Sequence, residues 1–285
     1  MKLPFFILIV LICLSVNIFS QDQSKAVEAY NRGLQLQNTG NNAKAILEYD
    51  IAIKANPKMV DAYNNRAVIK LAGGDMNGAI ADFSKSIEID KLRPLSYYNR
   101  GNVYLGNEQY DLAIYDFSKA IEIFNGITNS YDKVAHGMSL NNRGNALTAK
   151  GELKPALADY DRAILILPRS YEVLTSRGAV RQLLEDFAGA VNDYTKALEV
   201  FPDNALIYLN RAGALAEIDK KAAVSDYTKA IELEPTNAET YALRGTVLLS
   251  IGQKQEALAD LRKAIMLDPA LKPEYDKFVQ EALKK

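Results

Sequence analysis

The side chains that most often carry catalysis or bind metals are scarce in this sequence. It contains one histidine, His136, and one cysteine, Cys13, among 285 residues. One histidine cannot build a multi-histidine metal site, and one cysteine excludes a disulfide framework, a zinc finger and a cysteine-ligated iron–sulfur cluster. The sequence also has no phosphate-binding glycine loop and no nucleophile elbow. We therefore predict a protein that is not an enzyme and holds no metal or other cofactor.

The charge balance and the position of His136 help to exclude further classes of ligand. Lys and Arg number 34 against 35 Asp and Glu, whereas a nucleic-acid binder normally carries a basic excess. His136 lies beside Gly137, and nothing nearby forms a triad or a metal shell, so we expect a solvated loop side chain. These observations disfavour nucleic acid and a small-molecule substrate, and they leave a protein or peptide partner as the prediction.

A tripeptide that contains arginine recurs along most of the chain. It reads Asn-Arg-Gly or Asn-Arg-Ala at Arg32, Arg66, Arg100, Arg143 and Arg211, with related forms at Arg177 and Arg244. Successive arginines lie 34, 34, 43, 34, 34 and 33 residues apart. A fixed period of this length is the signature of a repeat protein.

A second pattern follows each arginine, with small residues and a bulky apolar residue in register. In the fourth unit, for example, the small residues are Gly144, Ala156 and Ala163, and the aromatic residue is Tyr160. Small side chains let two antiparallel helices approach closely, while the ring fills the wider gap. Most units end in a proline, such as Pro168, which stops a helix. Glycines stand where the turn between the helices is expected, at Gly40, Gly74, Gly151 and Gly252.

This pattern resembles the tetratricopeptide repeat, a helix–turn–helix unit of 34 residues. The resemblance covers residues 26–271 in seven copies: 26–59, 60–93, 94–127, 137–170, 171–204, 205–237 and 238–271. It implies an all-α fold, a right-handed superhelical solenoid. An insertion at about 124–136 separates the third and fourth copies; we expect a loop over Asn125–Ser130, and the next helix can begin at Tyr131. Residues 272–285 are predicted to form a capping helix over the seventh repeat.

The resemblance also implies a binding groove. Members of the family usually bind extended peptides or partner helices on the concave side, which the first helix of each repeat lines. The residue before each arginine faces that groove in related proteins, and here it is usually asparagine, which offers both a donor and an acceptor. Our candidate groove residues are Asn31, Asn65, Asn99, Asn142 and Asn210, with Asn64, Asn102, Asn141 and Asn145 widening the surface. An equally supported alternative is that these side chains bond to neighbouring helices and only set the stacking.

The repeat arginines have matched acids. Each one is followed fifteen or sixteen residues later by Asp or Glu, so that the arginine lies in the first helix of the repeat and the acid in the second. We therefore predict structural ion pairs within the repeats rather than clamps for phosphate or carboxylate. The pairs include Arg66–Asp82, Arg100–Asp116 and Arg143–Asp159.

The N-terminus has the features of a secretory leader over residues 1–20. Lys2 gives a positive start, residues 5–14 are uninterruptedly apolar, and the chain turns polar after Ser20. Cleavage after Ser20 would leave residues 21–25 as a short segment before the repeats. Two alternatives stay open, namely a retained membrane anchor over residues 3–19 and lipidation at Cys13. We expect an exported bacterial protein, periplasmic or secreted, with membrane contact only if the leader is retained.

Together these observations predict a non-enzymatic protein–protein interaction scaffold of the cell envelope or secreted space. It would bind an extended polypeptide or a partner helix in the concave groove. The alternative is a structural or assembly subunit of an envelope complex that uses its convex face or its edges. The repeat pattern does not identify the partner, because one fold serves many ligands.

Overall fold

The computed structural model describes residues 5–126 and 130–284, and it describes side chains for residues 21–126 and 132–284. Its regular secondary structure is helical, and no strand occurs in the described residues, which confirms the all-α class. Within residues 21–126 and 132–284, no helical stretch has the length and hydrophobicity that a membrane span requires. The side chains of the predicted leader, residues 1–20, and residues 127–129 of the insertion lie outside the described set.

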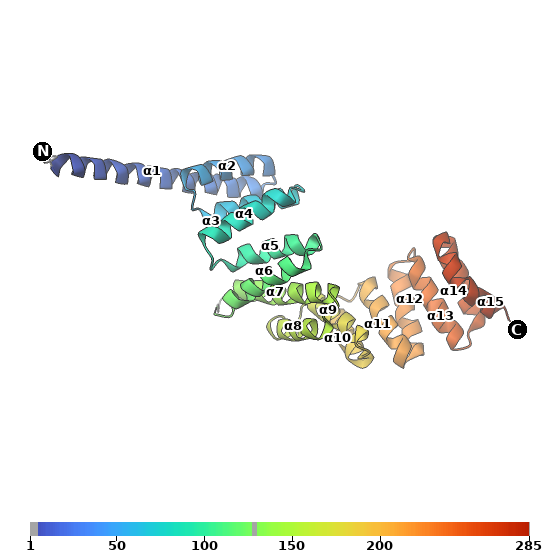
Figure 1. The fold of residues 1–285 in the computed structure, drawn as a ribbon. Helices are drawn as coiled ribbons and strands as arrows, with labels where there is room; N and C mark the ends of the chain where they lie inside the picture. The colour runs from blue at the N-terminus through green and yellow to red at the C-terminus, as the bar shows by residue number, and fades with distance from the viewer. Residues whose placement is uncertain (1–4, 127–129, 285) are drawn as a thin grey trace. The chain divides into compact units, whose positions relative to one another are not determined.

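The chain divides into two compact units, residues 1–142 and residues 143–285. In the first unit, antiparallel helical hairpins follow one another along the chain (Figure 1). They are α1 (Phe5–Asn38) with α2 (Asn42–Ala55), α3 (Val60–Ala72) with α4 (Met76–Ile89), and α5 (Pro94–Gly106) with α6 (Tyr110–Phe124). The next helix, α7 (Ser130–Ala149), begins in the first unit and ends in the second.

The second unit continues the same succession of hairpins after α7. Its further helices are α8 (Leu153–Ile166), α9 (Tyr171–Leu183), α10 (Phe187–Val200), α11 (Ala205–Ile218), α12 (Lys220–Leu233), α13 (Ala238–Ser250), α14 (Lys254–Leu267), the short 3₁₀ helix η1 (Pro269–Leu271) and α15 (Lys272–Leu283). We call the odd-numbered helices from α1 to α13 the A helices and the even-numbered helices from α2 to α14 the B helices. Each A helix carries the repeat arginine, and each B helix carries its acid.

The contact between paired helices depends on a small residue that faces a ring. A Cβ atom added to Gly178 on α9 would lie 2.8 Å from Cε1 of Tyr194 on α10, and one added to Gly144 would lie 2.7 Å from Cε1 of Tyr160. Neither distance leaves room for a methyl group. Tyr194 is 1% exposed, and Ala190 on the same helix is fully buried. Small side chains therefore let the two helices approach until the ring fills the space between them.

The turn within most repeats places one residue at positive φ. Gly40, Gly74, Gly151 and Gly252 have φ values between 76° and 85°. Glu108 and Glu185 occupy the same turn position in the third and fifth repeats, with φ values of 57° and 61°. A residue with a side chain pays about 1 kcal/mol in this region of backbone space. The same turn thus forms where glycine is missing, because packing of the two helices holds it.

The insertion differs from the prediction in one respect. Helix α7 begins at Ser130, so much of the insertion lengthens an A helix to 20 residues. His136 therefore lies in a helix rather than in a loop, and the expectation of a solvated loop histidine was wrong. Its ring stacks on Phe124 with a centroid distance of 5.7 Å. The extra helical turns supply a place for the ring against the end of α6.

Residues 21–25, which precede the first repeat, belong to α1, which runs from Phe5 to Asn38. Ala26 and Ala29 of this helix are fully buried, whereas most of residues 21–25 are exposed. The first repeat therefore has an A helix that extends beyond the hairpin in the N-terminal direction.

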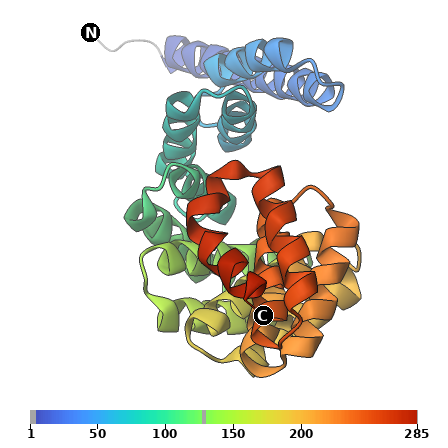
Figure 2. The same ribbon diagram turned by 90° about the vertical axis from the view of Figure 1, so that its right-hand side faces the viewer.

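The C-terminal helix packs on the last repeat. Figure 2 shows α13, α14 and α15 side by side in orange and red. Tyr275 and Val279 of α15 are buried in one cluster with Ala242, Leu261 and Ala264 of the seventh repeat. Leu283, at the end of the same helix, is 48% exposed. The helix covers a hydrophobic surface that would otherwise face water.

Candidate functional site

Two candidate groove asparagines hydrogen-bond to a neighbouring A helix. Asn65 on α3 donates from Nδ2 to the hydroxyl of Tyr30 on α1, at 3.1 Å. Asn142 on α7 donates to Oδ1 of Asn102 on α5, at 2.8 Å. Both bonds join successive repeats of the first unit. These side chains therefore help to set the stacking of the A helices.

Asn64 does not belong to an open groove surface. It is 8% exposed, and it accepts from Ser96 at 3.0 Å and donates to Ser86 at 2.7 Å. The two serine hydroxyls also contact each other, at 2.7 Å. The side-chain amide of Asn64 is therefore part of a buried hydrogen-bond network between repeats two and three. A buried amide whose donor and acceptor are both satisfied cannot take a ligand without losing these bonds.

Asn141 and Asn145, two residues before and two residues after Arg143, also bond to other side chains of the protein. Asn141 is 3% exposed and donates to Oδ1 of Asn142 at 3.0 Å. Asn145 accepts at 2.8 Å from the hydroxyl of Tyr160, the ring that fills the fourth hairpin. The structure therefore does not place either side chain as a free extension of the groove.

Three candidate asparagines keep their amides free of other described side chains. Asn31 is exposed, and Asn99 and Asn210 are half-buried on α5 and α11. No hydrogen bond joins their side chains to another residue in the described part of the chain. Each can therefore pair with the donor and the acceptor of a peptide unit.

The repeat arginines meet their acids in every repeat. The closest nitrogen–oxygen distances for the pairs lie between 2.6 and 2.9 Å. The pairs are Arg32–Glu48, Arg66–Asp82, Arg100–Asp116, Arg143–Asp159, Arg177–Asp193, Arg211–Asp226 and Arg244–Asp260. From Arg66 onward, Nε and Nη2 contact the two carboxylate oxygens separately, which is the strong bidentate geometry.

The remaining nitrogen of several arginines reaches the preceding repeat. Nη1 of Arg177 bonds to Asp161 on α8 at 2.7 Å, and Nη1 of Arg244 bonds to Thr228 on α12 at 2.9 Å. Arg66 makes the same kind of contact with Asp50. Each of these guanidinium groups therefore joins its own B helix to the B helix before it. The sequence predicted the contact within the repeat but missed the contact between repeats.

Burial limits what these pairs contribute to stability. Burial raises the pKa of Asp116 even though Arg100 donates to both of its oxygens. The attraction to the guanidinium therefore does not fully offset the loss of hydration around the carboxylate. Removing one member of such a pair costs far more than the intact pair contributes, because a buried charge is left without a partner.

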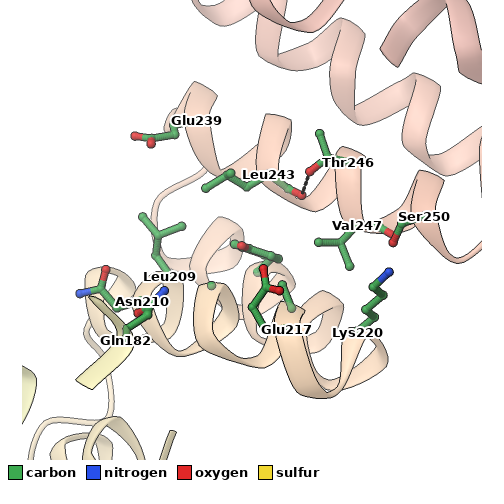
Figure 3. Close-up of a pocket in the computed structure, with 13 residues that line it drawn as sticks. Gln182, Leu209, Asn210, Glu217, Lys220, Glu239, Leu243, Thr246, Val247 and Ser250 are labelled. Carbon is green, nitrogen blue, oxygen red and sulfur yellow. Dashed lines mark hydrogen bonds between the residues drawn. The ribbon is translucent and has the colours of Figure 1, made fainter. Parts of the chain in front are cut away.

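The A-helix surface of the second unit contains a hollow of about 590 Å³ (Figure 3). Residues of α9, α11, α12 and α13 line it, and its walls combine apolar and charged side chains. They include Leu209, Asn210, Glu217, Glu239, Leu243 and Val247. Asn210 is the one candidate groove residue among its lining residues.

Two small residues of α11 create this space. Gly213 stands two positions after Arg211, where the other repeats of the second unit have Asn145, Ala179 or Thr246. A Cβ atom at Gly213 would come within 3.1 Å of Nε2 of Gln182, so the amide group occupies the place of a larger side chain. Ala216 stands five positions after Arg211, where other repeats have longer side chains such as Gln182. The hollow forms because Gly213 and Ala216 are smaller than the residues that occupy these positions in other repeats.

Ala216 also changes the surroundings of the buried ring. The hydroxyls of Tyr49 and Tyr194 donate to Gln37 and Gln182, which stand at the position of Ala216 in their repeats. Tyr227 is 2% exposed and lines the hollow, and its hydroxyl makes no hydrogen bond to another described residue. Burial, together with the nearby Tyr275, Glu239 and Glu217, raises the pKa of Tyr227 to about 12.

The sequence contained the signal for this site, although the repeat pattern drew attention elsewhere. Where the B-helix ring is Phe, as at Phe83, the A-helix partner is the apolar Leu71. Where it is Tyr, the partner is a hydrogen-bonding residue, such as Gln37 or Thr148. Tyr227 opposite Ala216 breaks this rule, and a comparison of the repeats position by position reveals it.

Comparison with known proteins agrees with this architecture. Family models of the tetratricopeptide repeat match residues 30–94 and 184–223, residues 94–124 and residues 226–259. Together the matched segments cover more than half of the chain. The molecule is thus a protein of helical-hairpin repeats, and the chain belongs to the tetratricopeptide-repeat family.

Solved structures of low sequence identity share the fold. The C-terminal part of a repeat protein from Cytophaga hutchinsonii has a TM-score of 0.67 at 20% identity, covering 90% of this chain and 100% of that one. A repeat protein from Parabacteroides merdae has a TM-score of 0.63 at 16% identity, covering 92% and 100%. YrrB, described as having an unusual peptide-binding site, has a TM-score of 0.57 at 23% identity, covering 72% and 97%.

One curated protein matches a short part of the sequence. Over 69 residues, the chain is 39% identical to the UDP-N-acetylglucosamine–peptide N-acetylglucosaminyltransferase of Giardia intestinalis. The match covers 24% of this chain and only 5% of the transferase. It therefore concerns a small repeat segment and not the whole of that protein.

The buried ion pairs give a test within one repeat. Asp193 has a fully buried side chain and contacts both Arg177 and Arg181, whereas Asp161 is 52% exposed and contacts Arg177 alone. We expect Asp193→Ala to lower the free energy of unfolding by about 3 kcal/mol, because two guanidinium groups lose their buried partner. The matched control Asp161→Ala should lower it by less than about 1 kcal/mol. Urea unfolding followed by circular dichroism measures both, and equal losses would contradict the assignment.

Proposed function

We propose that this protein is a non-enzymatic interaction scaffold that binds an extended polypeptide on its A-helix surface. The observation that carries the proposal is the hollow between α11 and α13, where apolar walls surround polar groups that have no protein partner. Asn210 is one of these groups, and Nε2 of Gln182, which faces Gly213, is another. A concave surface of this composition suits a peptide with both side-chain and backbone contacts.

Two further features support binding over catalysis. The repeat arginines are engaged with acids of the B helices, so they do not present free cations for a substrate phosphate or carboxylate. Groups of three or more metal-ligating residues that could hold an ion do not occur in the described residues. The fold is generally a non-catalytic scaffold, and we extend that role to the whole protein.

A second candidate function uses the other face. Several large apolar side chains of the B helices are exposed, among them Leu47 at 61%, Tyr115 at 57%, Leu165 at 84% and Met266 at 65%. Such residues favour a role as a structural or assembly subunit whose B-helix face packs on a stable partner. Because the two roles use opposite sides of the hairpins, they can be separated by position.

In-cell photocrosslinking distinguishes the two faces. A photoreactive residue at Asn99 or Asn210 probes the A helices, and one at Leu165 probes the B helices at a side chain that is 84% exposed. We expect specific protein adducts from the A-helix positions and only background from Leu165. An adduct from Leu165 alone, recovered as a stoichiometric complex, would overturn the scaffold and support the subunit.

Substitutions of Asn65 and Asn99 distinguish a role in helix stacking from a role in ligand binding. Asn65→Ala removes the bond to Tyr30, so we expect it to lower the free energy of unfolding by about 1 kcal/mol. Asn99→Ala removes no such bond and should leave stability within about 0.5 kcal/mol while weakening capture in the crosslinking assay. Thermal unfolding and adduct yield together measure both effects. Undiminished capture by Asn99→Ala would show that the asparagine ladder only sets stacking.

We propose further that the protein is exported through a leader over residues 1–20, and that it acts in the cell envelope or the secreted space. The polar turn after the apolar run of residues 5–14 is the observation behind this location. N-terminal sequencing and intact mass of the full chain expressed in a bacterium should show a mature protein that begins at Gln21. An uncleaved chain in the membrane fraction would indicate the anchor instead, and a diacylglyceryl mass at Cys13 would indicate a lipoprotein.

A further inference from the structure

The hollow between α11 and α13 carries an unneutralised negative charge. Glu217 lies in the last turn of α11, and Glu239 lies in the first turn of α13. Neither carboxylate forms an ion pair with a lysine or an arginine of the described residues. Lys220 stands on the rim of the same hollow, but it makes no ion pair with either acid. Figure 3 shows the Glu217 side chain directed toward the helix that bears Leu243.

Glu217 occupies an unfavourable position in its helix. The C-terminal end of a helix carries a partial negative charge, so a carboxylate in the last turn of α11 is destabilised there. In contrast, most other exposed glutamates near helix ends of the B helices pair with a lysine three residues before them, such as Glu232 with Lys229 at 3.0 Å. A cation at the hollow would relieve the repulsion that Glu217 experiences.

The floor of the hollow adds a third acceptor. The hydroxyl of Tyr227 lacks the partner that Gln37 and Gln182 supply to the equivalent tyrosines. Tyr227 is almost fully buried, and both carboxylates act electrostatically on its hydroxyl. The ring of Tyr227 is buried while its hydroxyl remains accessible at the hollow, so a ligand that donates a hydrogen bond can reach the hydroxyl oxygen. This observation is independent of the two acids, because it arises from Ala216 within the hairpin.

We propose that this hollow receives a lysine side chain of the bound polypeptide. An ammonium group has three donors and no acceptor, which suits the Glu217 carboxylate and the Tyr227 oxygen, and Glu239 adds negative charge at the edge of the hollow (Figure 3). The four-carbon stem of the lysine contacts the apolar walls formed by Leu209, Leu243 and Val247. An acidic side chain is repelled by the two carboxylates, and an apolar one leaves the Glu217 carboxylate and the Tyr227 oxygen unpaired. The inference rests on the proposed function, since it names what the polypeptide must present at this site.

The test uses the full chain and blocked peptides of glycine and alanine with one central residue. That residue is lysine, acetyl-lysine, norleucine or glutamate, so that charge and stem length vary separately. Binding is followed by NMR through the methyl groups of Leu209, Leu243 and Val247, which line the hollow. We expect the lysine peptide to shift these methyl signals, the acetyl-lysine and norleucine peptides to bind about tenfold more weakly, and the glutamate peptide to cause no shift.

Variants of the three acceptors complete the test. Replacing both acids, Glu217→Gln with Glu239→Gln, should weaken lysine-peptide binding about tenfold, and Tyr227→Phe should weaken it about threefold. The matched control, Glu232→Gln with Glu234→Gln, removes the same charge from exposed positions outside the hollow and should leave affinity unchanged. Unaltered positions of the other methyl signals establish that each variant is folded.

Three results would overturn the proposal: equal affinity for lysine and norleucine, no effect of the double variant on the acids, or no methyl shift with any peptide. If one of these occurs while a crosslinker at Asn210 still captures a polypeptide, only the lysine assignment falls. If the A-helix crosslinkers also capture nothing, the proposed scaffold function falls with it.

Discussion

The structure depends on the close contact between a small residue of each A helix and the bulky residue that it faces on the B helix, which is a ring in the first six repeats and Leu261 in the seventh. At Gly33 and Gly144 an added Cβ atom would lie 2.6 and 2.7 Å from the ring of Tyr49 or Tyr160. This contact sets how closely the two helices pack and therefore where every other side chain of the hairpin lies. It also brings the far end of the ring to the A-helix surface. Where the ring is a tyrosine, its hydroxyl therefore needs a hydrogen-bond partner at the A-helix surface.

The charged residues divide between the two sides of the hairpins according to the same geometry. The guanidinium groups of Arg177 and Arg244 turn toward the B helices and join their own repeat to the preceding one. The A-helix surface is left with asparagines, apolar side chains and a few acids. The charges that recur in every repeat therefore hold the hairpins together. Residues that depart from the repeat pattern, such as Glu217 and Ala216, alter the surface that can bind a partner.

Much of the fold was predictable because the same residue types recur at the same positions in each repeat. The seven arginine–acid spacings, the small residues and the turn glycines predicted the hairpins and the ion pairs within them. The sequence allowed the fourth A helix to begin at Tyr131, but nothing local indicated that His136 would stack on Phe124 of the preceding helix. The role of Asn64 was also missed: its partners Ser86 and Ser96 lie 22 and 32 residues away, and only packing of successive repeats joins them.

The sequence by itself determined the family, the hairpin unit and the partner of each repeat arginine, because these follow from residue types at a fixed spacing. Only the tertiary structure decided which asparagines are free and where the surface is hollow. Asn65 and Asn99 occupy the same repeat position, yet only Asn65 meets a hydroxyl on the adjacent A helix. The reason is that hydrogen bonding and open space depend on side chains of neighbouring repeats, and the period of one repeat does not encode those contacts.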